Sequence, residues 1–367
     1  MASTAKHDWL MVPFSESFDD VTRGLKKVPK SAYEEVGSTP IVDQSMNFIC
    51  GYTDEIPTLV SPPYIVFGDH TRELKYIDFA FVPGADGVKV LKPAEGIDPK
   101  FLYYYLKAHP VQDLGYSRHF KLLKELTIPL PPLDEQRRIA TILDEARVQT
   151  NQSDEAGTLL STMTSSWLST RSQSVPGVKL SELGTFRGGM TPSKKNPEFW
   201  GGGVYWFTTK DLKFGEVDES EERITDRALE ETSASLIGEP SIAFSLRGMS
   251  LAHRLPMSCI PGEATVNQDL KAFVPNQSMD RDVIFHLVKL KEMELLSKVS
   301  TSAHGTKKLD FRHLKELEIP DPSGEFGFEV RRVLEQIRDM QEQIRRRQAA
   351  SAKLFQVLST RAFQGEL

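Results

Sequence analysis

Leu123-Lys-Glu-Leu-Thr-Ile-Pro129-Leu-Pro131 recurs further along the chain as Leu314-Lys-Glu-Leu-Glu-Ile-Pro320-Asp-Pro322. Three further pairs of segments flank these two in the same order: residues 90–107 with 272–289, Arg137-Arg-Ile139 with Arg331-Arg-Val333, and Leu168-Ser-Thr-Arg171 with Leu358-Ser-Thr-Arg361. The spacing between partners stays between 182 and 194 residues. Matches that keep one order and nearly one spacing indicate two copies of a unit of roughly 185 residues.

Each copy is predicted to be a mixed α and β domain followed by a long helix. Short apolar runs between Gly and Pro predict strands at 58–66, 77–82 and 88–91, and at 204–209, 241–246 and 270–274. Shorter helices are expected at 101–107, with Asp98 and Pro99 at its start, and at 281–298. The fold class is therefore α+β, with domains at 1–133 and 174–324 and long helices at 134–173 and 325–367.

The two long helices each carry a narrow apolar stripe suited to a partner helix. Asp134 is the expected N-cap of the first. Residues at alternating +3 and +4 spacing predict a coiled-coil seam of about four heptads. Its apolar members are Ile139, Ile142, Leu160, Met163 and Trp167 in the first helix, and Val333, Ile337, Met340, Ile344, Leu354 and Leu358 in the second.

Chain direction predicts that the two helices pair antiparallel, which makes the repeat a pseudo-twofold. The first helix leads from domain one to domain two, so a paired second helix must run back. Pairing places Gln149 and Ser153 opposite Arg347 and Ser351, a polar layer that fixes register. The alternative is two amphipathic helices that each pack on their own domain.

Composition excludes several classes of protein. The chain has 367 residues and only two cysteines, so a disulfide framework or zinc cluster is excluded and a reducing cytoplasm is expected. No apolar run is long enough to cross a membrane, and MASTAKHDWLMVPF lacks the apolar core of a signal peptide. The net charge of -6 argues at first against a nucleic-acid partner.

The charge has a different meaning when it is divided by segment. Residues 216–231 hold eight acids and two bases, a stretch expected to face away from any DNA. Basic segments at 115–124 and 297–315 precede the Leu-Lys-Glu-Leu strand in both copies. A solvated charged loop is the simpler interpretation of each, but recurrence in both copies favours phosphate binding.

A Gly-, Pro- and aromatic-rich loop at 188–206 and two strand ends add further candidates for contacts with bases or phosphates. Trp200, Tyr205 and Trp206 of that loop could equally be core residues, and the arginines could form surface salt bridges. The candidate DNA-contacting residues are Arg72, Lys75, Arg118, Lys121, Thr191, Ser193, Lys194, Lys195, Lys210, Arg247, Lys307, Lys308 and Arg312.

A search for catalytic chemistry finds little. The sequence contains no phosphate-binding glycine motif, no Rossmann fingerprint and no zinc-binding histidine pair. Ser61-Pro-Pro-Tyr64 resembles the loop with which amino-methyltransferases hold a flipped base, but the glycine-rich turn for S-adenosylmethionine is missing. A Pro-Pro turn before a strand explains the same four residues.

The segment Ile128-Pro-Leu-Pro-Pro-Leu-Asp-Glu-Gln136 with Ile139 and Leu143 resembles the signature of the specificity (S) subunit of type I restriction–modification enzymes. Residues 183–192 and 205–212 look like the opening of one of that family's target recognition domains, and 361–367 is similar to its usual C-terminal end. The second copy of the signature departs from the pattern, because Ile319-Pro-Asp-Pro-Ser-Gly-Glu325 replaces it. The resemblance therefore specifies the start of the second helix less well, and it leaves open whether the two docking faces are equivalent.

The resemblance implies a non-catalytic subunit that reads double-stranded DNA. Each target recognition domain would read one half of a bipartite sequence, and the helices would dock two methyltransferase subunits, with restriction subunits bound through them. The chain would hold no metal and no cofactor, since S-adenosylmethionine, ATP and Mg belong to the partners. Two alternatives remain from the residues: a coiled-coil scaffold that binds protein, and a self-contained amino-methyltransferase.

Overall fold

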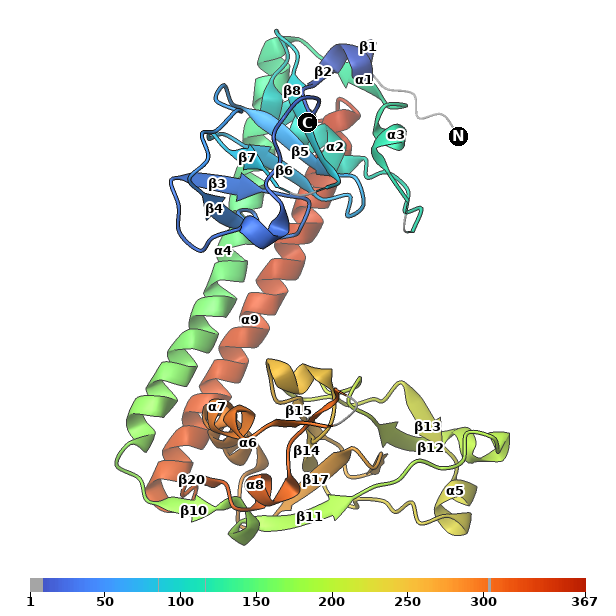
Figure 1. The fold of residues 1–367 in the computed structure, drawn as a ribbon, viewed down its shortest axis with the longest axis vertical. Helices are drawn as coiled ribbons and strands as arrows, with labels where there is room; N and C mark the ends of the chain where they lie inside the picture. The colour runs from blue at the N-terminus through green and yellow to red at the C-terminus, as the bar shows by residue number, and fades with distance from the viewer. Residues whose placement is uncertain (1–8, 85, 116, 303–304) are drawn as a thin grey trace. The chain divides into compact units, whose positions relative to one another are not determined.

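The computed structural model describes residues 9–84, 86–115, 117–302 and 305–367. Residues 1–8, which include part of the segment compared with a signal peptide, lie outside this set, as do residue 116 of one basic segment and residues 303–304 of the other. The chain divides into unit 1, Met1–Glu155 with Ile344–Leu367, and unit 2, Ala156–Gln343. Each unit contains one globular domain and half of each long helix (Figure 1).

Unit 1 contains three small sheets. β2-β8-β5-β6 is an antiparallel sheet, β4-β3-β7 includes the parallel pair β3 and β7, and β1 pairs with β9. The strands are β1 (Leu10–Pro13), β2 (Phe18–Asp20), β3 (Thr39–Val42), β4 (Gly51–Thr53), β5 (Tyr64–Gly68), β6 (Leu74–Ile77), β7 (Val82–Pro83), β8 (Val88–Pro93) and β9 (Thr127–Leu130). The strands predicted at 58–66 and 88–91 are confirmed by β5 and β8 with shifted ends. The strand predicted at 77–82 is wrong, because Ile77 ends β6, Val82 begins β7, and the residues between them link the two.

Three short helices of unit 1 pack on one face of the four-stranded sheet: α1 (Phe14–Ser17), α2 (Pro99–Ala108) and α3 (Phe120–Leu123). The 3-10 turn η1 (Lys30–Ala32) lies elsewhere and has no buried residue. α2 begins as predicted, since the Asp98 carboxylate accepts the Phe101 N–H at 2.9 Å. Alternation along β5 then divides the core, because Ile65 and Phe67 face α2 whereas Tyr64 and Val66 face the β3–β7 side.

Unit 2 repeats this topology. Its sheets are β11-β17-β14-β15, β13-β12-β16 with β12 and β16 parallel, and β10-β20, to which unit 2 adds the two-stranded sheet β18-β19. The strands are β10 (Gly177–Lys179), β11 (Gly184–Gly188), β12 (Trp200–Phe207), β13 (Glu222–Ile224), β14 (Ser241–Ser245), β15 (Met257–Ile260), β16 (Ala264–Val266), β17 (Leu270–Pro275), β18 (Ser300–Thr301), β19 (Lys307–Lys308) and β20 (Glu318–Pro320). The shared strand order confirms the internal repeat.

The shorter helices of unit 2 include one correction. They are η2 (Leu180–Glu182), η3 (Pro197–Phe199), α5 (Asp226–Glu231), η4 (Met249–Ala252), α6 (Arg281–Leu290), α7 (Glu292–Ser297) and α8 (Phe311–Lys315). The single helix predicted at 281–298 is therefore broken at Lys291. The break lets the Glu292 carboxylate accept the Leu255 N–H at 2.8 Å and pair with Lys289.

The long helices are α4 (Leu133–Ser172) and α9 (Gly324–Phe363). Asp134 is not the N-cap of α4, because the Pro132 carbonyl accepts the N–H groups of Glu135 and Gln136 and so closes the first turn. Asp134 lies in that turn with its side chain 99% exposed. Its negative charge still interacts favourably with the positive end of the helix dipole.

The two helices pair antiparallel within each unit, as predicted. In unit 1, Arg138 near the start of α4 donates to the carbonyl of Leu367, and Asp154 accepts from Gln348 at 2.7 Å. In unit 2, Arg171 near the end of α4 pairs with Glu329 near the start of α9. The polar contact of unit 1 is therefore Asp154 with Gln348, whereas Gln149 and Arg347 of the predicted layer are exposed.

Half of the predicted seam is displaced by one residue. Ile139, Leu160 and Trp167 of α4 are buried or half-buried, as are Ile337, Ile344 and Leu358 of α9. Ile142 and Val333 are half-buried beside the more deeply buried Leu143 and Leu334. The clear errors are Met163, Met340 and Leu354, whose residues are 60%, 52% and 44% exposed, while Thr164, Gln341 and Phe355 take the half-buried positions. A stripe spaced i, i+3, i+7 and one spaced i, i+4, i+7 differ by one residue at every other position. Packing against the partner helix decides which of the two adjacent residues faces it.

The described residues include no helix that is both long and apolar enough to cross a membrane. Both cysteines are free thiols, and Cys259 is buried.

We expect the two cysteines to react at very different rates. Burial raises the pKa of Cys259 to about 12, so almost none of it is thiolate at pH 8. Cys50 is partly exposed. Iodoacetamide should alkylate Cys50 in the native protein and modify Cys259 only after denaturation, as read by peptide mass spectrometry. Equal native rates would contradict the burial of Cys259.

Candidate nucleic-acid interface

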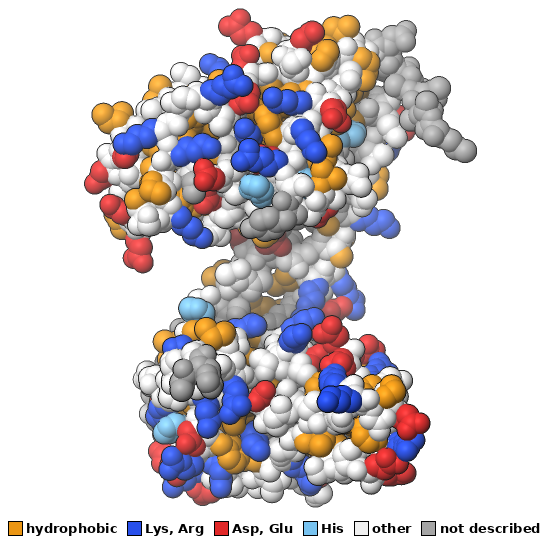
Figure 2. Space-filling view, turned by 45° about the vertical axis from the view of Figure 1, so that its right-hand side comes forward, with side chains coloured by type: hydrophobic (Ala, Val, Ile, Leu, Met, Phe, Trp, Pro, Cys, Tyr) orange, Lys and Arg blue, Asp and Glu red, His pale blue; other side chains and the backbone are white. Residues whose placement is uncertain are grey.

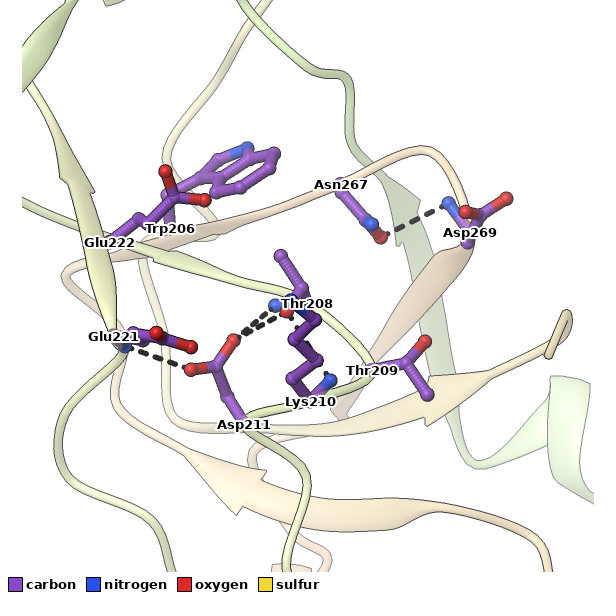
Figure 3. Close-up of a pocket in the computed structure, with 9 residues that line it drawn as sticks. All are labelled: Trp206, Thr208, Thr209, Lys210, Asp211, Glu221, Glu222, Asn267 and Asp269. Atoms are coloured by element: carbon purple, nitrogen blue, oxygen red, sulfur yellow. Dashed lines mark hydrogen bonds between the residues drawn. The ribbon is translucent and has the colours of Figure 1, made fainter. Parts of the chain in front are cut away.

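A polar cleft of about 530 Å³ opens in unit 2 where the parallel strands β12 and β16 end (Figure 3). Loops that follow both strands supply its walls, and β13 adds a third side. The residues that line it are Trp206, Thr208, Thr209, Lys210, Asp211, Glu221, Glu222, Asn267 and Asp269. Donors and acceptors of this kind, in a concave surface, match the edges of nucleobases.

Asp211 holds two walls of the cleft together. Its carboxylate accepts the N–H of Thr208 at 2.7 Å, the hydroxyl of Thr208 at 2.8 Å and the N–H of Glu221 at 2.8 Å (Figure 3). The residue is only 8% exposed. Asp211 is therefore a positioning group, whereas the exposed Lys210 beside it is available to a ligand.

The acidic segment 216–231 does not face away from this cleft as a whole. Glu221 and Glu222 line it, so that part of the prediction is wrong. The reason is the pairing of β13 with β12, which brings the acids beside the aromatic loop. Glu222 pairs with Lys194, whose ammonium also lies 3.4 Å from the centre of the Trp200 ring.

Arg247 and the hairpin β18–β19 meet at the end of β14. The backbones of Arg247 and Lys308 form an isolated antiparallel β-bridge, and the Gly248 N–H donates to the Lys307 carbonyl at 3.0 Å. Cations about 60 residues apart in the sequence are thus brought together, as a phosphate-binding surface requires. Asp269 lies 3.8 Å from Arg247 and joins this edge to the cleft.

The remaining candidate residues of unit 2 differ in exposure and in whether their side chains already bond to other residues of the protein. Thr191 donates to the Gln268 side chain, and its residue is half-buried. Arg312 is held by the Asp310 carboxylate at 3.0 Å, and this hydrogen bond keeps the pKa of Asp310 at about 2. Ser193 and Lys195 are exposed. Trp206, for which the sequence also allowed a place in the core, is only 3% exposed.

Unit 1 has the equivalent surface, with different residues. The segment after β3, the end of β7 and the β5–β6 turn correspond to the cleft loops and to the Arg247 turn. Arg72 lies in that turn and pairs with Asp113 at 2.6 Å. Arg118 and Lys121 are exposed on the basic segment, which docks on the turn because Asp69 accepts the N–H groups of His119 and Phe120.

Lys75 is not a surface cation. The residue is 4% exposed, and its ammonium donates to the carbonyls of Asp43 and Asn47. Alternation along β6 turns this position inward, so we remove Lys75 from the candidate DNA contacts.

On the face that Figure 2 shows, Lys and Arg side chains gather over the middle of unit 1, with Asp and Glu mostly toward its edges. Basic and acidic side chains lie next to one another on unit 2. Sequence reasoning missed Asn267, Asp269 and the segment after β3. Their signal is the end of a parallel strand, which is recognisable only once the strand order is known.

Comparison with known proteins identifies the relatives of this chain. Residues 19–154 and 175–348 match the family described as the type I restriction modification DNA specificity domain. The EcoR124I/EcoR124II specificity subunit of Escherichia coli is 28% identical over 336 residues, which cover 86% of this chain and 83% of that protein. The MjaIX specificity subunit of Methanocaldococcus jannaschii is 30% identical over 170 residues, covering 45% and 38%.

Solved structures share the fold. The S subunit of a type I restriction–modification system from M. genitalium superposes with a TM-score of 0.54 at 15% identity, over 99% of this chain and 98% of that one. A chain from a study of type I assembly and conformational transition gives 0.52 at 17% identity, over 98% of both chains.

Proposed function

The chain belongs to the type I restriction–modification DNA specificity family, and from this premise we propose that each of its two units reads one half of a bipartite duplex target. The chain is the DNA specificity subunit of such a system, and catalysis resides in the methyltransferase and restriction subunits. A role in reading DNA places it in the cytoplasm.

The observation that supports two half-sites is the repeated surface. In both units, a parallel pair of strands ends beside a turn that carries an arginine. The arginine is Arg72 in unit 1 and Arg247 in unit 2. A basic segment docks on that turn in both units. Two like surfaces in one chain suit a target of two short blocks with an unread spacer.

The exposed apolar side chains of the long helices support docking of two methyltransferase subunits. Val148, Leu159 and Met163 of α4 are 52–60% exposed, and Met340 of α9 is 52% exposed. Apolar groups on the outer faces of a helix pair favour a protein partner. Restriction subunits, S-adenosylmethionine, ATP and Mg would all enter through these partners. Much of the phosphate contact would come from them as well, so the free chain should bind DNA weakly.

The test is a methylation map. The chain assembled with its methyltransferase subunit should methylate one sequence of two short blocks at a constant separation. An assembled complex that binds DNA with no dependence on sequence would favour the scaffold alternative. Retention of S-adenosylmethionine by the isolated chain would favour the methyltransferase alternative.

Removing the hairpin cations should weaken binding to all sequences alike. We expect Lys307→Ala with Lys308→Ala to lower the slope of log affinity against log salt by about 2, because each lost phosphate contact removes about 0.9. The control is Lys298→Ala, since Lys298 already pairs with Glu294 at 2.8 Å. An altered target sequence with an unchanged salt slope would show that these lysines read bases instead.

A further inference from the structure

The segment 43–50 of unit 1 presents apolar side chains at a place where unit 2 presents polar ones. It leaves the carboxyl end of β3 and turns back to β4 without regular structure. Met46 at its tip is 87% exposed, and Phe48 is 47% exposed with its ring 5.9 Å from Phe79, edge-on. We call residues 43–50 the apolar loop.

The apolar loop is held at its base by interior bonds. The buried ammonium of Lys75 donates to two of its carbonyls, those of Asp43 and Asn47. The Cys50 thiol donates to Asp43 at 2.7 Å, and the Cys50 N–H donates to the Ile41 carbonyl at 2.9 Å. A buried lysine is costly unless its donors are satisfied, so this cluster serves to fix the backbone of the loop.

Gln44 fastens the loop to its neighbours. Its side-chain amide donates to the Asp86 carbonyl at 2.9 Å, and its backbone carbonyl accepts the hydroxyl of Thr71 at 2.6 Å. A Cβ on Gly68 would lie 2.9 Å from the Cβ of Gln44, so this close approach needs glycine, and Gly87 needs glycine because its φ is +85°. The tip therefore presents Met46 from a rigid support.

The internal repeat indicates what the loop faces. Its counterpart in unit 2 is the segment 208–221 between β12 and β13, whose first four residues line the polar cleft. That segment also carries Phe214, which is 54% exposed and packs against Phe285 of α6 instead of projecting alone. The Arg72 turn adjoins the loop through Thr71, as the Arg247 turn adjoins the cleft through Thr209, whose hydroxyl bonds Ser245 at 2.8 Å. The exposed tip of the unit 1 segment is thus apolar, whereas the residues of the unit 2 segment that line the cleft are polar.

We infer that the apolar loop inserts Met46, supported by Phe48, between adjacent base pairs of the first half-site. This inference rests on the proposed function of unit 1. Apolar wedges of Met or Phe unstack a base step and bend the duplex, and they need a stiff support because the stack resists them. Unit 2 reads its half-site through hydrogen bonds in the cleft instead.

Insertion also restricts the sequence of the first half-site. Pyrimidine–purine steps such as TA and CA unstack most easily. The first half-site should therefore contain such a step at the insertion point, and the second half-site need not.

The experiment uses the complex of the full chain with its methyltransferase subunit and duplexes that carry 2-aminopurine at successive positions of the mapped target. The native complex should raise the fluorescence at one step of the first half-site. Met46→Ser should abolish that rise and weaken specific binding at least 10-fold, whereas Met46→Leu should keep both. Ile56→Ser is the matched control, because Ile56 is equally exposed at 87% in the same unit but lies outside the loop.

Three results would overturn the inference: no fluorescence rise in the first half-site with the native complex, a rise that survives Met46→Ser, or equal losses with Met46→Ser and Ile56→Ser. If thymine-to-uracil replacement weakens binding as much as Met46→Ser does and no base unstacks, Met46 contacts a thymine methyl and insertion is wrong. Failure of the proposed function looks different, because the native complex would then have no bipartite target.

Discussion

Phe363→Ala should lower the free energy of unfolding of unit 1 by about 3–5 kcal/mol, the range for a buried Phe in a core. Phe363 ends α9 and is 9% exposed. Its ring centre lies 5.5 Å from that of Phe101 and 5.3 Å from that of Tyr105, both on α2. Substitution removes the side chain that joins the last turn of the chain to the first domain.

Hydrogen exchange measures this effect within the right unit. Trp9 is the sole tryptophan of unit 1, so tryptophan fluorescence reports mainly on unit 2. Amides of α2 should exchange about a hundredfold faster in Phe363→Ala, as a loss of 3 kcal/mol requires. Val357→Ala on the same helix is the control, because Val357 is 46% exposed and should cost less than 0.5 kcal/mol. Similar exchange in the two variants would contradict the packing of Phe363.

Asp211→Ala should lower the free energy of unfolding of unit 2 by about 2–4 kcal/mol. The substitution leaves the N–H groups of Thr208 and Glu221, which form partly buried hydrogen bonds, without their acceptor, and bonds to a charged acceptor are stronger than neutral ones. Urea unfolding followed by tryptophan fluorescence suits this unit, since Trp206 lines the same cleft. Recognition of the second half-site should fall while that of the first is kept.

Asp218→Ala provides the comparison for Asp211→Ala. Asp218 lies seven residues further along the chain, in the acidic segment 216–231, and is exposed. Its loss changes the net charge equally, so any general effect of charge on DNA affinity appears in both variants. Equal unfolding midpoints for the two variants would show that Asp211 does not hold the cleft walls together.

Local patterns predicted much of this molecule. The recurrence of Leu-Lys-Glu-Leu with its flanking segments predicted two like domains, and their strand orders match. Asp98 before Pro99 predicted the start of α2, because a cap is a bond between near neighbours in sequence. The antiparallel pairing of α4 with α9 followed from the order of the elements.

The candidate site was only partly predictable. The exposed Lys308 and the half-buried Lys307 were predicted as candidates from the composition of their segment. Lys75 looked the same in sequence, yet β6 turns it into the interior, where two carbonyls accept its protons. Met46 gave no signal, since an isolated methionine is as consistent with a core as with a surface.

The sequence by itself determined the repeat, the fold class and the family, because these depend on spacing and on short motifs that survive as local patterns. Only the tertiary structure decided which of two adjacent residues faces the partner helix, as with Met163 and Thr164. It alone brought Arg247 to Lys308, and it alone identified the ends of the parallel strands as the candidate reading surface. The physical reason is that these features depend on contacts between segments distant in the chain, which no local period encodes.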